Sequence, residues 1–271
     1  MLRRTLLVSA ALALGVAGTP YVAQAETTYG PPYDFPTELM GDGGGLDGTG
    51  VIPLKNRAMI DRTEHGYRYR SGQQDGHLVV TLTAEGLYFV DSGTASFRSL
   101  GAGCSPRATS VGVAAVCTMP QGVTESEPLL LEVWPRLGND YTDGSSLPAT
   151  VAMAVLADAG NDVVRLGAGP DFANGAQDQD RIHGGDGNDW LRGGAGHDYV
   201  HGMSGADLLV SADGRDTLFG GDGDDRLYGG GAQDRLYAGP GADLVNCGPG
   251  GDYAWVDRAD RTRSCESVSR R

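Results

Sequence analysis

Hydrophobic residues in the second half of the chain recur with a period of nine. Between residues 157 and 255 an apolar side chain stands at every ninth position, in eleven consecutive copies. The segment around each position is too short for a helix and predicts a brief strand with one residue facing inward. The apolar positions are Val164, Ala173, Ile182, Leu191, Val200, Leu209, Leu218, Leu227, Leu236, Val245 and Ala254.

Aspartate and glycine keep the same period. An aspartate lies two residues before each apolar position, and a glycine lies two residues before the aspartate in all copies except those with Asp178 and Ala232. The unit is therefore G-G-x-G-x-D-x-U-x, where U is apolar. Glycine permits the positive φ of a tight turn, and such a turn gathers carbonyl and carboxylate oxygens, the hard ligands that calcium prefers. The candidate metal ligands are Asp162, Asp171, Asp180, Asp189, Asp198, Asp207, Asp216, Asp225, Asp234, Asp243 and Asp252, with the turn glycines Gly185, Gly187, Gly194, Gly196, Gly221 and Gly223.

Short strand-like runs alternate with turns in the first half, and no long stretch has helical periodicity. The expected strands cover residues 66–70, 77–83, 87–90, 111–118, 129–137 and 150–156. Because Gly138-Asn139-Asp140 echoes Gly160-Asn161-Asp162, the coil is expected to begin before residue 157. We expect residues 63–156 to form a β-rich segment that leads into the repeats and caps them.

The N-terminal residues have the features of an export signal. Arg3 and Arg4 precede an apolar run, and Ala23-Gln24-Ala25 fits a cleavage site, so residues 1–25 are predicted to be removed. The paired arginines weakly resemble a twin-arginine signal, and the general secretory route is favoured. Residues 26–62 are interpreted as a flexible leader rich in proline and glycine. No other stretch has the length of apolar sequence needed to span a bilayer.

The repeats from 157 to 255 resemble the RTX, or hemolysin-type, calcium-binding nonapeptide repeat. This resemblance implies an all-β fold, a right-handed parallel β-roll in which one coil spans two units, or 18 residues. It also implies that each calcium ion lies between turns two units apart, so that Asp162 would act with Asp180 and Asp234 with Asp252. Eleven units allow at most nine such pairs (11 − 2), and departures from the motif, including Met203, reduce that number.

The charge of the chain supports a need for cations. The formal net charge is -14, and removal of the two signal arginines changes it to 19 − 35 = −16. Residues 157–255 contain 17 aspartates and 6 arginines, or −11. Because stacked carboxylates repel one another, we expect this half to be unfolded without calcium. An acidic chain is also a poor partner for nucleic acid or an anionic membrane surface.

Four cysteines in a secreted chain suggest two disulfides. Three connectivities are possible, and proximity in sequence favours Cys104 with Cys117 and Cys247 with Cys265. The second pair would fold residues 256–271 over the open end of the repeats as a C-terminal cap. The ending of the chain, with its cysteines and arginines, resembles that of secreted calcium-binding repeat proteins of high-GC Gram-positive bacteria.

The first half has no HExxH, GxSxG or GxxxxGK[ST] motif, and the adjacent pair Glu64 and His65 is better explained as surface residues than as a catalytic site. We therefore expect a secreted, monomeric calcium-binding protein rather than an enzyme. Two alternatives stay open: a hydrolase within residues 63–156, and an extracellular adhesion or matrix module. The second alternative would use an outward ladder, although mutual stacking that stabilises the solenoid is favoured for its residues His183, His201, Phe219, Tyr237 and Trp255.

Overall fold

A computed structural model describes residues 56–72 and 75–271, which all belong to one unit of the chain. The predicted export signal lies outside these residues, as does the predicted leader up to residue 55. The described residues form strands and no helix, which confirms the expected all-β class. Accordingly, no helix in this part of the chain is long and apolar enough to cross a membrane.

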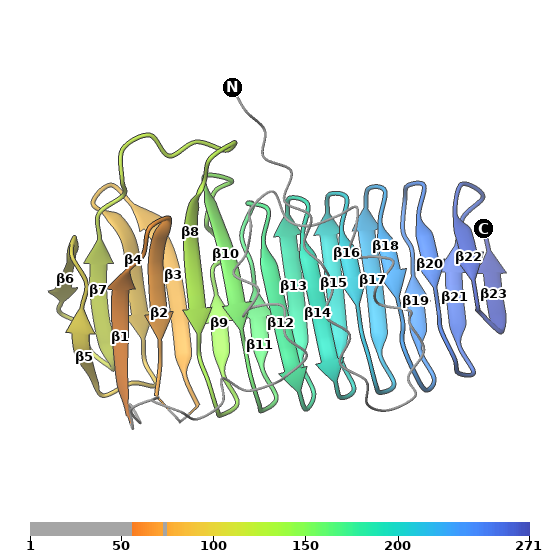
Figure 1. Cartoon of the computed structure of the whole chain (residues 1–271), viewed down its shortest axis with the longest axis horizontal. Coiled ribbons are helices and arrows are strands. Elements are labelled where there is room, and N and C mark those ends of the chain that lie inside the picture. The colour runs from red at the N-terminus through yellow and green to blue at the C-terminus, as the bar shows by residue number, and fades with distance from the viewer. Residues whose placement is uncertain (1–55, 73–74) are drawn as a thin grey trace, which may run out of the picture. The chain divides into compact units, whose positions relative to one another are not determined.

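Two sheets, whose strands are parallel through the repeats, form a flattened solenoid (Figure 1). We name the 11-stranded sheet sheet A and the 12-stranded one sheet B. Sheet A contains β1 (Arg57–Arg62), β2 (Gly66–Arg70), β5 (Ser96–Leu100), β8 (Leu129–Trp134), β10 (Val151–Leu156), β12 (Phe172–Gln177), β14 (Trp190–Ala195), β16 (Leu208–Val210), β18 (Arg226–Tyr228), β20 (Leu244–Asn246) and β22 (Arg261–Arg263). Sheet B contains β3 (His77–Thr83), β4 (Gly86–Asp91), β6 (Cys104–Arg107), β7 (Val113–Cys117), β9 (Tyr141–Asp143), β11 (Val163–Arg165), β13 (Arg181–Asp186), β15 (Tyr199–Ser204), β17 (Thr217–Asp222), β19 (Arg235–Tyr237), β21 (Tyr253–Val256) and β23 (Ser267–Arg270).

Each repeat strand pairs in parallel with the strand two further along the chain. Leu191 of β14 is in register with Ala173 of β12 and with Leu209 of β16, a separation of 18 residues on both sides. Successive units therefore alternate between the sheets, and the predicted 18-residue coil is confirmed. The repeating apolar residues of both sheets meet in one core and are at most 1% exposed.

The solenoid begins well before residue 157. Strands β2, β8 and β10 continue sheet A, and β3, β9 and β11 continue sheet B, all in parallel register. Larger side chains fill this part of the core, among them Tyr67, Tyr69 and Phe89. The segment over 63–156 thus supplies the first coils of the solenoid.

The far end of the first half is antiparallel. Strand β1 pairs with β2, and β4, β7 and β6 extend sheet B beyond β3. Strand β1 occupies residues 57–62, which the sequence had placed in the leader, and its inward residues Ala58 and Ile60 are fully buried. Strands β5, β6 and β9 were likewise not expected, whereas β2 and β3 have their predicted bounds.

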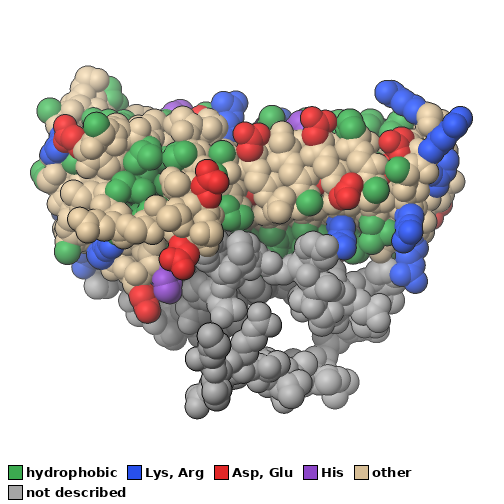
Figure 2. All heavy atoms as spheres, turned by 90° about the horizontal axis from the view of Figure 1, so that it is seen from above, with side chains coloured by type: hydrophobic (Ala, Val, Ile, Leu, Met, Phe, Trp, Pro, Cys, Tyr) green, Lys and Arg blue, Asp and Glu red, His purple; other side chains and the backbone are tan. Residues whose placement is uncertain are grey.

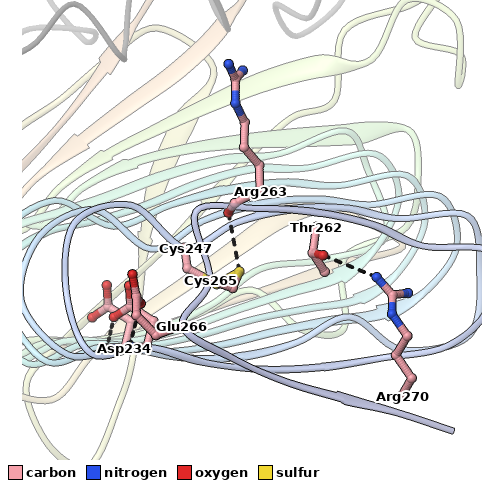
Figure 3. The surroundings of a disulfide bond; sticks show 8 residues. Asp234, Cys247, Thr262, Arg263, Cys265, Glu266 and Arg270 are labelled. Atoms are coloured by element: carbon pink, nitrogen blue, oxygen red, sulfur yellow. Dashed lines mark hydrogen bonds between the residues drawn. A yellow bond between two sulfur atoms is a disulfide. The ribbon is translucent and has the colours of Figure 1, made fainter.

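Two disulfides join the predicted cysteines. Cys104 and Cys117 face each other across β6 and β7, and Cys247 is bonded to Cys265. The second bond, between Cys247 and Cys265 (Figure 3), holds the tail over the last coil. There β22 and β23 add one strand to each sheet. Basic side chains gather at this end of the roll in Figure 2. Arginines on the terminal strands disfavour pairing with another sheet edge.

Candidate metal centre

The repeating aspartates form two ladders, one along each side of the roll. In each ladder the Oδ1 atom of an aspartate accepts a hydrogen bond from the backbone N–H of the aspartate 18 residues earlier. The N–O distances are 2.9 Å from Asp162 to Asp180 and 2.8 Å from Asp171 to Asp189. The same bond links every later pair up to Asp234 and Asp252. Each carboxylate is therefore held in place by the preceding coil.

The second oxygen of almost every carboxylate is buried and has no hydrogen-bond partner. This holds for the Oδ2 atoms of ten of the eleven predicted aspartates, all within the described residues. Asp171 differs because its Oδ2 accepts a bond of 2.9 Å from the N–H of Gly167. Buried acceptors without a donor are costly, so ten oriented oxygens call for a positively charged ligand.

We call these Oδ2 atoms without a hydrogen-bond partner the orphan oxygens. Backbone carbonyl oxygens lie close to them at the first glycine of the unit. A Cβ atom built on Gly184 would lie 2.4 Å from Asp189 Oδ2 and 2.6 Å from the carbonyl oxygen of Gly202, in the next coil. The equivalent distances at Gly220 are 2.4 Å to Asp225 Oδ2 and 2.3 Å to the Ala238 oxygen. Oxygens from two coils thus converge where any side chain would collide, which explains the glycine.

Without a cation, the folded roll disfavours the ionised form of these carboxylates, as their raised pKa values show. Burial raises their pKa, neighbouring aspartates of the ladder raise it further at several positions, and the backbone hydrogen bonds partly oppose the rise. The pKa of Asp189, for example, is raised well above its ordinary value by burial and then by Asp171 and Asp207. The pKa rises to about 8 for Asp162, Asp171, Asp225 and Asp234, to about 7 for Asp180 and Asp216, and to about 6 for Asp207 and Asp243; it is also raised for Asp198 and Asp252.

The predicted turn glycines lie in the turns that join the two sheets. Five of the six adopt positive φ, and Gly196 does not. Gly187 illustrates the constraint, since its φ is 123° and a Cβ atom there would lie 2.3 Å from the Gly169 oxygen of the preceding coil. The others with positive φ are Gly185, Gly194, Gly221 and Gly223.

Several residues that replace a glycine of the motif still adopt the positive φ that favours glycine. Met203, Asp178 and Ala232 have φ values of 85°, 73° and 78°. An L-residue in this region is strained, at a cost of about 1–3 kcal/mol. The neighbouring coils therefore hold these turns in a backbone conformation that the residues themselves disfavour.

Replacing Met203 by glycine is expected to stabilise the calcium-bound chain by about 1 kcal/mol, because its side chain is 43% exposed and loses little buried area. The free energy of unfolding in saturating calcium measures the effect. The neighbouring Ser204→Gly, where φ is not positive, is the control and should destabilise by about 0.5–1 kcal/mol. Equal effects of the two substitutions would contradict strain at Met203.

Three acidic residues outside the repeats extend the ladders. The N–H of Asp243 donates to Oδ1 of Asp260 at 3.0 Å, and the N–H of Asp252 donates to Glu266 at 3.0 Å, as Figure 3 illustrates for Glu266. At the other end Asp140 has an orphan Oδ2 and a pKa raised to about 8 by burial. The sequence indicated a coil at Asp140 but no ligand, and the spacings of 17 and 14 residues hid Asp260 and Glu266.

The described residues contain no cluster of three or more His, Cys, Asp or Glu side chains suited to a metal. A cation in these turns would therefore be held by at most two carboxylates together with backbone carbonyl oxygens. An all-oxygen set of this kind fits calcium, which accepts six to eight oxygens in flexible geometry, better than zinc or copper. His197 is not part of such a site, since its Nδ1 accepts a hydrogen bond from the N–H of Arg215.

The outward ladder on sheet B is a stack of rings. The ring centroids of Phe219 and Tyr237 are 4.4 Å apart, with an angle of 5° between the ring planes. Those of Tyr237 and Trp255 are also 4.4 Å apart, with an angle of 6° between the planes. His183 and His201 continue the row in tilted contacts. Because stacked rings cover both faces of Tyr237, those faces are not open to a sugar ring, which favours the stabilising role.

The comparison with family models identifies the repeat. The model of the RTX calcium-binding nonapeptide repeat, described as four copies, matches residues 155–173, 174–209 and 210–245. This is the stretch of the roll that carries most of the orphan carboxylate oxygens. Searches of curated proteins and of solved structures found no match.

Proposed function

We propose that this chain, whose residues 155–245 match the model of the RTX calcium-binding nonapeptide repeat, is a secreted protein that binds several calcium ions and folds its roll on export. The observation that carries the proposal is the row of ten buried Oδ2 atoms without partners. Calcium would neutralise these carboxylates and complete the oxygen set of each turn.

The proposed ligands are the repeating aspartates with carbonyl oxygens of the turn glycines. Each ion lies between turns two units apart on one side of the roll, so that Asp189 and Asp207 serve one site and Asp207 and Asp225 the next. The number of ions is at most about nine. Asp171 is the weakest candidate because both of its oxygens accept backbone hydrogen bonds.

Export and calcium act together in this proposal. Scarce cytoplasmic calcium keeps the repeats unfolded, and millimolar calcium outside folds them, within the affinity range of about 10⁻⁴–10⁻³ M found for extracellular modules. The two disulfides support an oxidising compartment. Removal of residues 1–25 and a monomeric state are parts of the same proposal.

Calorimetric titration of the chain from Glu26 with calcium tests the proposal, with circular dichroism followed in parallel. Several ions should bind with a cooperative gain of β structure, and magnesium at the same concentration should not replace them, because it requires a smaller and more rigid octahedral site. Absence of calcium binding would refute the proposed function.

A matched pair of substitutions in one unit tests the ligands. Asp189→Asn should weaken calcium binding by roughly tenfold or more, since it removes the charge and one oxygen of a buried ligand. It should also stabilise the calcium-free chain, because a desolvated carboxylate is removed. Asp186→Asn removes the same charge from an exposed position of the same turn and is the control. Equal losses of affinity in the two variants would indicate a general charge effect and contradict the assignment.

A further inference from the structure

The outer face of sheet A is apolar over its first coils. Six side chains on β8, β10, β12 and β14 form one cluster there, separate from the core between the sheets. We call this cluster the apolar face. It consists of Leu130, Trp134, Ala154, Leu156, Phe172 and Trp190.

The apolar face is covered. Ala154 and Phe172 are 0% exposed although they point away from the core, and Leu130 is 7% exposed. At the equivalent outward positions of sheet B, Val163 and Tyr199 are half-buried and Arg181 is exposed. The indole Nε1 atoms of Trp134 and Trp190 are also shielded from solvent without a partner among the described residues. The Arg68 guanidinium lies over the ring of Trp134, 4.3 Å from its centroid. The hydrophobic residues of the cluster all belong to the face itself, and side chains that lie beside one another on a single face do not by themselves bury Phe172 completely.

The charge of the outer face is opposite to that of the whole chain. The outward positions of sheet A strands from β2 onward include one acidic residue, Glu132, which Arg68 binds at 2.7 Å. Arg70 is also paired, with Asp61 of the neighbouring strand β1. The outward positions include six arginines, giving 6 − 1 = +5 on a chain of net charge -14. The arginines are Arg68, Arg70, Arg192, Arg226, Arg261 and Arg263. An acidic segment with apolar side chains suits such a surface.

We propose that residues 31–55 of this chain bind the apolar face of sheet A. The segment has four acidic residues and one lysine, or 1 − 4 = −3, and its apolar side chains include Tyr33, Phe35, Leu39 and Met40. It joins β1, which lies in sheet A two strands from β8. From β1 to β14 there are five strand spacings, about 24 Å. A chain of 25 residues can extend about 80 Å, so its length is ample.

The segment is favoured over a second copy of the chain because it is covalently joined to the sheet that it would bind. Its effective concentration at the apolar face is therefore high. Its acidic and apolar residues are interspersed, as are the arginines and apolar residues of sheet A. The binding is independent of the calcium sites, which lie in the turns, and it is tested in saturating calcium.

Tryptophan fluorescence tests the proposal in the chain from Glu26. The Trp255→Phe background leaves Trp134 and Trp190 as the reporters. Changing Tyr33, Phe35, Leu39 and Met40 together to serine should shift their emission to the red and increase acrylamide quenching at least twofold. The matched control retains only Trp255, on sheet B, and its quenching should not change. Unchanged quenching of Trp134 and Trp190 would overturn the proposal.

A photo-cross-link provides a readout that does not depend on the quadruple variant. Benzoylphenylalanine in place of Phe35 should cross-link within one chain to a peptide that contains a residue of the apolar face. A cross-link to sheet B would refute the assignment. A cross-link between two chains, with dimers in analytical ultracentrifugation, would show that a second copy covers the face and would also refute it.

Discussion

Chelating calcium at neutral pH is expected to abolish the β structure of residues 157–255. Each unit orders nine residues around a single repeating apolar side chain, and that burial alone does not offset the loss of conformational entropy. The carboxylates add repulsion, since the ladders place aspartates such as Asp189 and Asp207 in adjacent coils with one oxygen of each unsatisfied. The free energy of calcium binding is then the free energy of folding.

Hydrogen exchange measured by mass spectrometry resolves this effect along the chain. In chelator, amides of β13 to β21 should exchange as fast as those of an unfolded chain, and millimolar calcium should slow them at least a hundredfold. Strands β3, β4 and β7 should stay protected, because they have a core with Phe89 and the disulfide between Cys104 and Cys117. Slow exchange of the repeats in chelator, or equal protection by magnesium, would contradict a calcium-dependent fold.

Lowering the pH is expected to have opposite effects on the calcium-free and the calcium-bound roll. The pKa of Asp225 is raised by burial from its ordinary value of 3.8 to about 8, and that of Asp180 to about 7. A group whose pKa is higher in the folded state binds its proton more tightly there. Its stabilisation is complete below pH 3.8 and is lost as the pH rises through about 7–8. Without calcium, the roll should therefore gain β structure as the pH falls from 8 to 5.

Calcium reverses this dependence because it binds the deprotonated carboxylate. Calcium affinity should fall by about tenfold or more between pH 8 and pH 6, and binding at pH 7 should release protons. Circular dichroism in chelator across this range, with calorimetry in two buffers of different ionisation enthalpy, measures both parts. The Asp189→Asn variant should release fewer protons than Asp186→Asn. A calcium-free roll that loses structure on acidification would contradict the assigned burial of the ladders.

The period of nine determined the solenoid and its register. One apolar residue per unit, as at Leu191, Leu209 and Leu227, can form a continuous core only if alternate units stack in parallel. The aspartates two residues earlier then necessarily align into ladders. For this reason the all-β fold and the candidate aspartates could be predicted from the sequence, whereas the 18-residue coil was implied by the resemblance to the RTX repeat.

Where the repeat breaks down, the sequence was less informative. Strand β1 and the ladder residues Asp260 and Glu266 lie outside the period, so no pattern marked them, and the echo at Gly138-Asn139-Asp140 indicated a coil but not a ladder residue at Asp140. Their roles arise when chain segments far apart or irregularly spaced are brought beside the repeats, as Asp260 is placed by the tail that Cys265 holds. Only tertiary structure brings such residues together.

The sequence by itself determined the repeating roll and its candidate calcium ligands, because both follow from local spacing. The tertiary structure decided which carboxylate oxygens are left without partners. Each of Asp171 and Asp189 uses Oδ1 to accept a bond from the preceding coil, but Oδ2 of Asp171 also accepts one from Gly167 in its own turn, whereas Oδ2 of Asp189 has no donor. The tertiary structure also decided that an outward residue such as Phe172 is buried, because burial depends on what packs over a face and not on the alternation along a strand.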